Sequence, residues 1–232
     1  MMLLVKTKCS INNLKKNKMV YVSIDIETSG LDHEKHKVLS IGAIIEDTEK
    51  KLPYEECPKF NAIVLQNEIT GSPRALTMNK GIIAMIGEYL EGTDDVRFNM
   101  DTILNYSFYR EDEVVKKFYE FLWVNGYGDS VPNQLLVTSK IDSNTKPITL
   151  NVAGKNFGTF DKLFLQQLPW WQKLIRTRQR VLDPAILMVD WKNDKSLPNL
   201  TQCKERAGIE GMVTHDALED AWDVIEVLRK FY

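Results

Sequence analysis

The chain has few of the residues that build disulfide or zinc frameworks. Its 232 residues include only three cysteines, Cys9, Cys57 and Cys203, and no two of them form a Cys-x-x-Cys pair. Scattered cysteines argue against a disulfide-stabilised secreted domain and against a structural zinc site. This pattern indicates a reducing compartment, so a cytoplasmic location is expected.

Long apolar runs and a dominant charge are also missing. No run approaches the roughly 18 apolar residues of a membrane span, and Met1–Val5 is too short for the core of a signal peptide. The 30 basic and 32 acidic residues leave a net charge of −2, so no overall basic field favours a nucleic-acid partner. We therefore expect no membrane partner, and expect any nucleic acid to be bound through local basic patches or metal ions.

The sequence has no internal repeat, no low-complexity tract and no Gly-rich phosphate loop. Residues 154–159, Gly-Lys-Asn-Phe-Gly-Thr, lack the G-x-x-x-x-G-K-[ST] arrangement. A composition of 44% hydrophobic and 27% charged residues is typical of a soluble globular protein. The length favours one domain. We expect a short polar extension over residues 1–18 and a single domain over 19–232, with an insertion within about 67–147, most simply at 127–146.

What the sequence does contain is an alternating strand near its beginning. Apolar and polar residues alternate from residue 20 to residue 27, which is the period of a β-strand. Residues two apart share a face, so Asp25 and Glu27 project side by side. Two carboxylates at the end of a buried strand repel each other and lose hydration, and a divalent cation offsets both effects. The alternative, with Asp25 capping the turn and Glu27 in water, stays open on this strand alone.

The remaining pattern predicts an α/β fold. Apolar runs at 38–45 and 60–65 indicate two further strands, which form an antiparallel meander with the first. A strand over 148–154, a helix over 157–168 and a short strand at 180–182 follow later. Other expected elements are helices over 82–90, 111–124, 198–207 and 217–231 and a short strand at 135–137. This order of elements predicts a mixed sheet.

Three further residues are candidates for chemistry. Asp161 opens the helix that follows the 148–154 strand, so it reaches the sheet end of the first carboxylates if the two strands are neighbours. His215 precedes the last helix, Asp216 is its expected N-cap, and Asp220 lies inside it. A fixed carboxylate beside an imidazole suits a metal ligand and a general base. Each residue alone also has an ordinary role, such as a carboxylate that favours the helix dipole or a salt-bridged surface pair.

Taken together, these motifs resemble a known family. Residues 25–31, Asp-Ile-Glu-Thr-Ser-Gly-Leu, are similar to D-x-E-T-[TS]-G-L, the first motif of the DEDDh 3′–5′ exonucleases. Residues 156–161, Asn-Phe-Gly-Thr-Phe-Asp, resemble the second motif. Residues 215–221, His-Asp-Ala-Leu-Glu-Asp-Ala, resemble the third, H-x-A-x-x-D-A. The three occur in the order of this DnaQ-like family, which includes the proofreading subunit of DNA polymerase III, ribonuclease T and oligoribonuclease.

The resemblance implies a ribonuclease-H-like fold, with a mixed central sheet flanked by helices, and hydrolysis with two metal ions. Two divalent ions, Mg²⁺ or Mn²⁺, would be held by Asp25, Glu27, Asp161 and Asp220, with His215 as the base that activates water. The expected activity is removal of nucleoside 5′-monophosphates from the 3′ ends of single-stranded nucleic acid, with DNA slightly favoured over RNA.

Substrate contacts are expected beside these carboxylates. Thr28, Ser29 and Leu31 follow the first pair and are placed to meet the last nucleotide, while Asn156 and Phe157 belong to the second motif. The rings of Phe157 and Phe160 can stack on a base, although we expect at least one of them to lie in the core.

The segment that follows Trp170 and Trp171 is basic. Arg176, Arg178 and Arg180 either line the path of a nucleic-acid strand or protect an exposed sheet edge. Asp183 is interpreted as the cap of the helix that begins at Pro184.

Two departures from the family pattern bear on the substrate. Lys155 stands where many members have a histidine, and the five-residue separation of Asn156 from Asp161 is closer to that in oligoribonuclease. The alternatives are therefore an oligoribonuclease-like exoribonuclease, an internally cutting nuclease, or a non-catalytic nucleic-acid-binding module of the same fold. Protein partners, including a homodimer, remain open.

Overall fold

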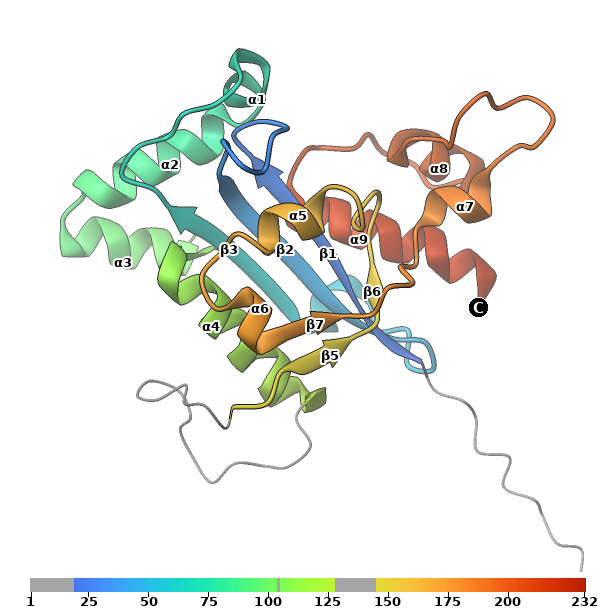
Figure 1. Cartoon of the computed structure of the whole chain (residues 1–232), viewed down its shortest axis with the longest axis horizontal. Coiled ribbons are helices and arrows are strands. Elements are labelled where there is room, and N and C mark those ends of the chain that lie inside the picture. The colour runs from blue at the N-terminus through green and yellow to red at the C-terminus, as the bar shows by residue number, and fades with distance from the viewer. Residues whose placement is uncertain (1–18, 104, 128–144) are drawn as a thin grey trace, which may run out of the picture.

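The computed structural model describes residues 19–103, 105–127 and 145–232 (Figure 1). The expected extension over 1–18, the expected strand at 135–137 and most of the expected insertion at 127–146 therefore lie outside the described residues.

The centre of the fold is a mixed five-stranded sheet, counted over the described part of the chain, with the order β4-β3-β2-β1-β6. β1 (Val20–Thr28), β2 (Val38–Asp47) and β3 (Lys59–Leu65) form the expected antiparallel meander. β4 (Ser107–Arg110) is parallel to β3, and β6 (Val152–Ala153) is parallel to β1. The mixed sheet predicted from the sequence is confirmed.

The strand expected over 148–154 is divided between two sheets. β5 (Ile148–Leu150) pairs with β7 (Ile175–Thr177) in a separate two-stranded sheet, and β6 returns to the central sheet. The division falls at Asn151, whose side-chain amide donates to the Val20 carbonyl oxygen at 3.0 Å. The strand expected at 180–182 was wrong in extent, because only Leu182 forms a bridge there, to Ala153.

Helices surround the sheet; the helix expected over 82–90 is extended at both ends, and the others end earlier or begin later than expected. The expected last helix is α9 up to Leu228 and then continues as a 3₁₀ turn to Phe231. The helix expected over 157–168 is reduced to α5, because the preceding residues form turns. The helices are α1 (Pro73–Met78), α2 (Lys80–Glu91), α3 (Asp94–Ile103), α4 (Glu111–Leu122), α5 (Asp161–Leu165), α6 (Trp171–Leu174), α7 (Pro184–Met188), α8 (Leu200–Ala207) and α9 (Ala217–Leu228).

The two faces of the sheet are covered by different helices (Figure 1). Val22, Ile24 and Ile26 of β1 pack with α4, α5 and α6 in the largest apolar cluster. Tyr21, on the opposite face, packs with α9. Because side chains alternate along a strand, Asp25 and Glu27 also belong to the face that α9 covers.

A glycine allows α9 to approach this face closely. Gly42 of β2 is paired with Asp25, and a Cβ atom at Gly42 would lie 2.2 Å from the backbone nitrogen of Leu218. No larger residue fits there without moving the helix. The start of α9 is therefore held directly beside the first carboxylate.

In the described part of the chain, no helix combines the length and apolar character needed to span a membrane.

Candidate functional site

The first two acidic residues lie at the end of β1 nearest the start of α9. Asp25 is partly buried and Glu27 is 9% exposed. The pairing of β1 with β2 shifts register between Glu27 and Thr28, so the chain turns away just after the second carboxylate. The strand thus delivers two carboxylates to one place, as the alternation of residues predicted.

Asp161 reaches the same place from the opposite side of β1. It is the first residue of α5, is 2% exposed, and accepts hydrogen bonds from its own backbone N–H and from that of Ile26. The Ile26 N–H is available because β6 pairs with β1 only at Val22 and Ser23. The shortness of β6 therefore leaves an open strand edge that Asp161 occupies.

The third contribution comes from the start of α9. The Asp216 carboxylate caps the helix by accepting from the N–H groups of Leu218 at 3.0 Å and Glu219 at 3.1 Å, as predicted. The Glu219 side chain does not complete a capping box; it accepts instead from the Thr214 hydroxyl at 2.6 Å. The hydroxyl of Tyr106 also donates to Asp216.

The cap places His215 just before the helix and Asp220 within its first turn. His215 precedes the helix, is exposed, and has a positive φ of 58°. Asp220 is 6% exposed, and its Oδ1 atom has no hydrogen-bond partner among the described residues. A buried carboxylate oxygen without a donor is the state in which a cation is the natural partner.

Three of these side chains meet at one point. One ligand atom each from Glu27, His215 and Asp220 lies within 4.8 Å of the other two. Asp25 is close enough to Asp161 and Asp220 for their charges to raise its pKa. One strand and two helix starts thus bring together the five residues that the motifs singled out.

Burial raises the pKa of every carboxylate in this cluster, and neighbouring acidic charges add to the rise at Asp25, Glu27 and Asp220. The pKa of Glu27 rises to about 8, mainly by loss of hydration, and that of Asp161 rises to about 7 for the same reason. Burial and then the nearby Asp223 raise the pKa of Asp220 to about 7. Burial followed by the charges of Asp161 and Asp220 raises the pKa of Asp25 well above its ordinary value. A bound cation would reverse these shifts.

The only buried ammonium described near this cluster is already engaged. Lys204 is 5% exposed and its Nζ lies 2.6 Å from both carboxylate oxygens of Asp223. It lowers the pKa of Asp220 less than burial raises it. The four carboxylates therefore lack a sufficient positive partner within the described protein, and their oxygen-rich set with one imidazole fits divalent ions such as Mg²⁺ or Mn²⁺.

Asn79 belongs to the site but was not found from the sequence. It lies between α1 and α2, is 4% exposed, and donates from Nδ2 to the Thr28 carbonyl at 3.1 Å. Its side chain also hydrogen-bonds the Glu27 carboxylate, which opposes the rise in the pKa of Glu27. The only signal in the sequence was a polar residue at a break between two helical patterns, which is too common to identify a site.

The residues after Glu27 have different surroundings. Leu31 is 81% exposed, whereas the Thr28 hydroxyl is buried and donates to the Gly30 carbonyl at 2.8 Å. Ser29 is fully buried; its hydroxyl donates to the Thr70 carbonyl at 2.7 Å and accepts from the Lys37 N–H at 3.0 Å. The Ser29 side chain holds two loops together and is not available to a nucleotide, contrary to the expectation from the motif.

The second motif is similarly divided between surface and core. Asn156 is exposed with φ of 59°, and its N–H donates to Asp183 at 3.0 Å. Phe157 is fully buried in the core, so of the two aromatic rings it is a core one and is not placed to stack on a base. Asp183 accepts from the Ala185 N–H at 2.9 Å and caps α7, which confirms its interpretation as a helix cap.

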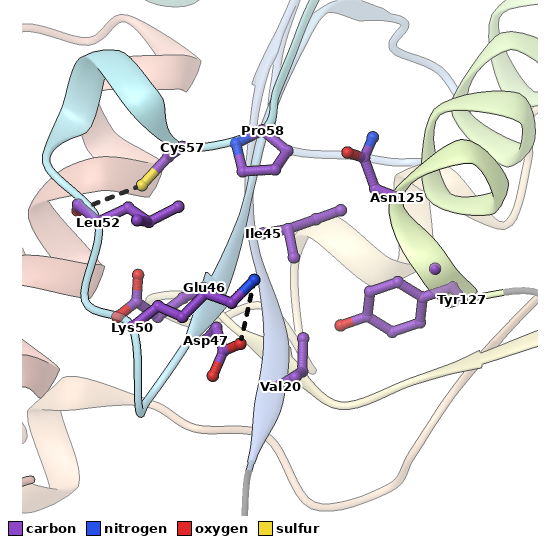
Figure 2. A pocket seen from close by; sticks show the side chains of 11 residues that line it. Val20, Ile45, Glu46, Asp47, Lys50, Leu52, Cys57, Pro58, Asn125 and Tyr127 are labelled. Atoms are coloured by element: carbon purple, nitrogen blue, oxygen red, sulfur yellow. Dashed lines mark hydrogen bonds and ion pairs between the residues drawn. The ribbon is translucent and has the colours of Figure 1, made fainter.

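A separate cavity of about 360 Å³ lies at the other end of β1. Figure 2 shows that Val20, Ile45, Lys50 and Tyr127 surround it, with Asp47 joined to Lys50. None of the five candidate residues lines this cavity. Its lining contains two acidic side chains, Glu46 and Asp47, against one basic side chain, Lys50, which is unsuited to a phosphodiester.

Comparison with known proteins places this arrangement in a recognised fold. No protein-family model and no curated protein matches the chain. A zinc-bound complex of E. coli Exonuclease I with single-stranded DNA is 15% identical, with a TM-score of 0.54, over 90% of this chain and 39% of that chain. Exonuclease I of Methylocaldum szegediense is 18% identical, with a TM-score of 0.52, over 91% of this chain and 40% of that chain. Cell-death related nuclease 4 is 12% identical, with a TM-score of 0.51, over 91% of this chain and 62% of that chain.

At these identities the likeness concerns the fold. The chain has the ribonuclease-H-like α/β fold of these exonucleases, as the motifs implied, and spans about 40% of the length of the Exonuclease I structures.

Proposed function

We propose that the protein is a metal-dependent 3′–5′ exonuclease that removes nucleoside 5′-monophosphates from single-stranded nucleic acid, DNA in preference to RNA. The observation that carries this proposal is the convergence of Glu27, His215 and Asp220 within 4.8 Å, next to Asp25 and Asp161. The shared fold adds support, since one structural neighbour is a complex of Exonuclease I with single-stranded DNA.

The four carboxylates would hold two divalent ions, Mg²⁺ or Mn²⁺. Such ions neutralise a phosphodiester and increase the acidity of a bound water molecule. The charges of Asp161, Asp220 and Glu27 all act on the pKa of Asp25, so Asp25 is the ligand that we expect both ions to share. The unpartnered Oδ1 of Asp220 supplies a further ligand atom.

His215 acts as the general base in this proposal. Its imidazole is exposed at the mouth of the site, so it can take a proton from the attacking water and release it to solvent. Because the imidazole is exposed, His215 is not a residue of the hydrophobic core. The loop position lets the ring move without disturbing the Asp216 cap, whose hydrogen bonds lie within α9.

Two exposed residues remain candidates for contact with the terminal nucleotide. Leu31 offers an apolar surface just beyond Glu27, which suits the face of a base. Asn156 offers an exposed amide before α5. The backbone around Thr28 and Ser29 lines the same turn, although both hydroxyls are engaged in the protein.

The proposal is tested by digestion of 5′-labelled single-stranded DNA and RNA with Mg²⁺ or Mn²⁺. The expected result is a ladder that shortens from the 3′ end, loss of activity in Asp25→Ala, and no cleavage of circular single strands. His215→Ala should lower turnover by about 10²–10⁴-fold while sparing metal binding measured by calorimetry. Equal activity of the wild type and Asp25→Ala would refute the assignment, and cleavage of circles would identify an internally cutting nuclease.

The oligoribonuclease-like alternative has one specific observation in its favour. The separation of Asn156 and Asp161 is five residues, which resembles that enzyme. A preference for very short RNA over long DNA in the same assay would replace our choice of substrate. A non-catalytic binding module would bind single-stranded DNA or RNA and would degrade neither.

A further inference from the structure

The charge of the protein is unevenly distributed along the chain. Residues 145–182 contain seven of the 30 basic residues and one of the 32 acidic residues, and that acid is Asp161. This segment therefore carries a charge of +6, and the rest of the chain carries −8. A net charge of −2 conceals a strongly basic element inside an acidic protein.

The basic residues of this segment are free to bind an anion. Arg176, Arg178 and Arg180 are exposed, and none of them forms an ion pair with another residue that the structure describes. Some exposed cations elsewhere are paired, as Lys37 is with Glu111 at 2.9 Å and Arg206 with Asp194 at 2.5 Å. Unpaired arginines close together repel one another unless an external anion lies between them.

A bulge over residues 178–182 follows the regular pairing of β7. The Arg178 N–H donates to the Leu150 carbonyl at 2.9 Å, and the Leu182 N–H donates to the Val152 carbonyl at 2.9 Å. Four residues on one strand therefore match two on its neighbour, and the excess residues include Arg180. Bulges commonly re-aim side chains beside active sites.

The same segment leads to the carboxylate cluster. The Gly154 N–H donates to the Leu182 carbonyl at 3.2 Å, and the Asn156 N–H donates to Asp183 at 3.0 Å. Residues 156–160 then lead directly into Asp161. Figure 1 shows β7 beside α6 and below α5, on the side of the sheet that faces the viewer. Extended residues from 176 to 183 cover up to about 23 Å, which is enough for several phosphates.

We propose that Arg176, Arg178 and Arg180 bind the phosphates of a single-stranded polynucleotide that extends in the 5′ direction from the catalytic cluster. This inference rests on the proposed function. It assigns the strand a path over β7 and the bulge, from the loop before α5 toward α6. At the α6 end, the exposed ring of Trp170 lies 4.9 Å from Lys116 Nζ and 5.7 Å from Lys173 Nζ, which extends the basic surface.

The competing explanations are a guarded sheet edge and an interface with a second copy. Charge at the edge of β7 would discourage strand pairing. In the second explanation, the arginines would attract the acidic part of another copy of the protein. Neither explanation connects the arginines to the length of a nucleic-acid substrate, so substrate length separates them from our proposal.

The test compares R176Q/R178Q/R180Q with the wild type and with K192Q/K195Q/K230Q. The control removes the same charge from three exposed lysines outside this surface. Binding of a fluorescent thymidine homopolymer is measured by anisotropy in EDTA over a series of salt concentrations. Hydrolysis of that homopolymer and of a thymidine dinucleotide is measured separately with Mn²⁺.

For the arginine variant we expect a Kd for the long strand that is about 10- to 100-fold higher at ~0.1 M salt. The slope of log K against log salt should fall by about 2, since each phosphate contact on a single strand contributes about 0.7. Turnover of the dinucleotide should be unchanged, and the lysine control should match the wild type in all measurements.

The outcomes separate this inference from the proposed function. Weaker binding by the arginine variant with no hydrolysis by any protein would preserve the surface and refute the nuclease. Normal hydrolysis with unchanged affinity and salt slope would refute the surface alone. Salt-sensitive self-association of the wild type that disappears in the arginine variant, with unchanged DNA binding, would show that a second copy occupies it.

Discussion

At the residue scale, the site is a group of carboxylates that the protein does not neutralise itself. Glu27, Asp161 and Asp220 all have raised pKa values, at about 8, 7 and 7, because they are buried together. In the unfolded chain their pKa values are about 4. The folded state therefore favours the protonated carboxylates, and metal-free stability should fall as pH rises from about 4 through 8.

The Asp220→Asn variant should recover part of the stability that the metal-free protein loses as pH rises. Removing one charge relieves repulsion, so the metal-free variant should melt at a higher temperature than the wild type at pH 8, by about 2–4 °C for each kcal/mol relieved. The difference should vanish near pH 4, where the wild-type carboxylates are protonated. Added Mn²⁺ should raise the Tm of the wild type only, because the variant loses a ligand. Identical melting curves at pH 8 would contradict the electrostatic account.

Asn79 is expected to matter through Glu27. Asn79→Ala removes a donor to that carboxylate and to the Thr28 carbonyl, so Glu27 loses its orientation. We expect metal affinity measured by calorimetry to fall by about 10- to 100-fold.

The matched control for Asn79 is Asn151→Ala. Asn151 also donates to a β1 carbonyl, that of Val20 at 3.0 Å, but at the other end of the strand. The Asn151→Ala variant should have a lower free energy of unfolding and an unchanged metal affinity. Equal effects of the two variants on metal affinity would reduce Asn79 to a structural residue.

At the element scale, the site depends on how closely α9 approaches the sheet. Gly42 is the residue that permits this, since a Cβ there would lie 2.2 Å from the Leu218 nitrogen. Helix and sheet cannot both keep their positions with a side chain between them. The geometry of His215 and Asp220 relative to Asp25 is therefore set by one missing methyl group.

Gly42→Ala should reduce both stability and activity. Forcing a methyl group into packed backbone costs about 1–3 kcal/mol, and displacement of α9 would separate the ligands. Urea unfolding and metal titration measure the two effects. Gly87→Ala in α2 is the control: a Cβ there meets nothing within 4 Å, so the variant should gain about 0.5–1 kcal/mol in a helix interior. A Gly42→Ala protein as stable as the wild type would refute the close-packing argument.

Elements with local signals were predictable from the sequence, and those with distant partners were not. The meander of β1, β2 and β3 and the Asp216 cap follow from alternation and from capping chemistry within a few residues. β7 and the division at Asn151 depend on partners about 25–130 residues away, which no local pattern encodes.

The candidate site shows the same division. The five chemical residues stand out in their motifs because carboxylates are rarely placed on apolar strands and helix faces. Burial of Ser29 could not be foreseen, since the same motif contains exposed Leu31, and the sequence did not decide which of Phe157 and Phe160 is the core residue. Asn79 was missed because its partner, β1, is about 50 residues earlier in the chain.

At the scale of the whole molecule, the acidic and basic parts have separate places. The basic segment 145–182 includes β5, β6, α5, α6 and β7, whereas the remaining chain carries −8. An anionic polymer would be repelled from most of the acidic chain and attracted to one side. Such a field favours oriented encounter with the substrate, and this advantage decreases as salt rises.

The position of α9 has a consequence for how the protein is made. His215 and Asp220 come about 190 residues after Asp25, and both are needed for the proposed chemistry. A ribosome that has completed only the central sheet would carry a chain with two ligands and no base. The two ligands on β1 would therefore be made well before the rest of the site, and the proposed chemistry would wait for α9 to dock on the sheet.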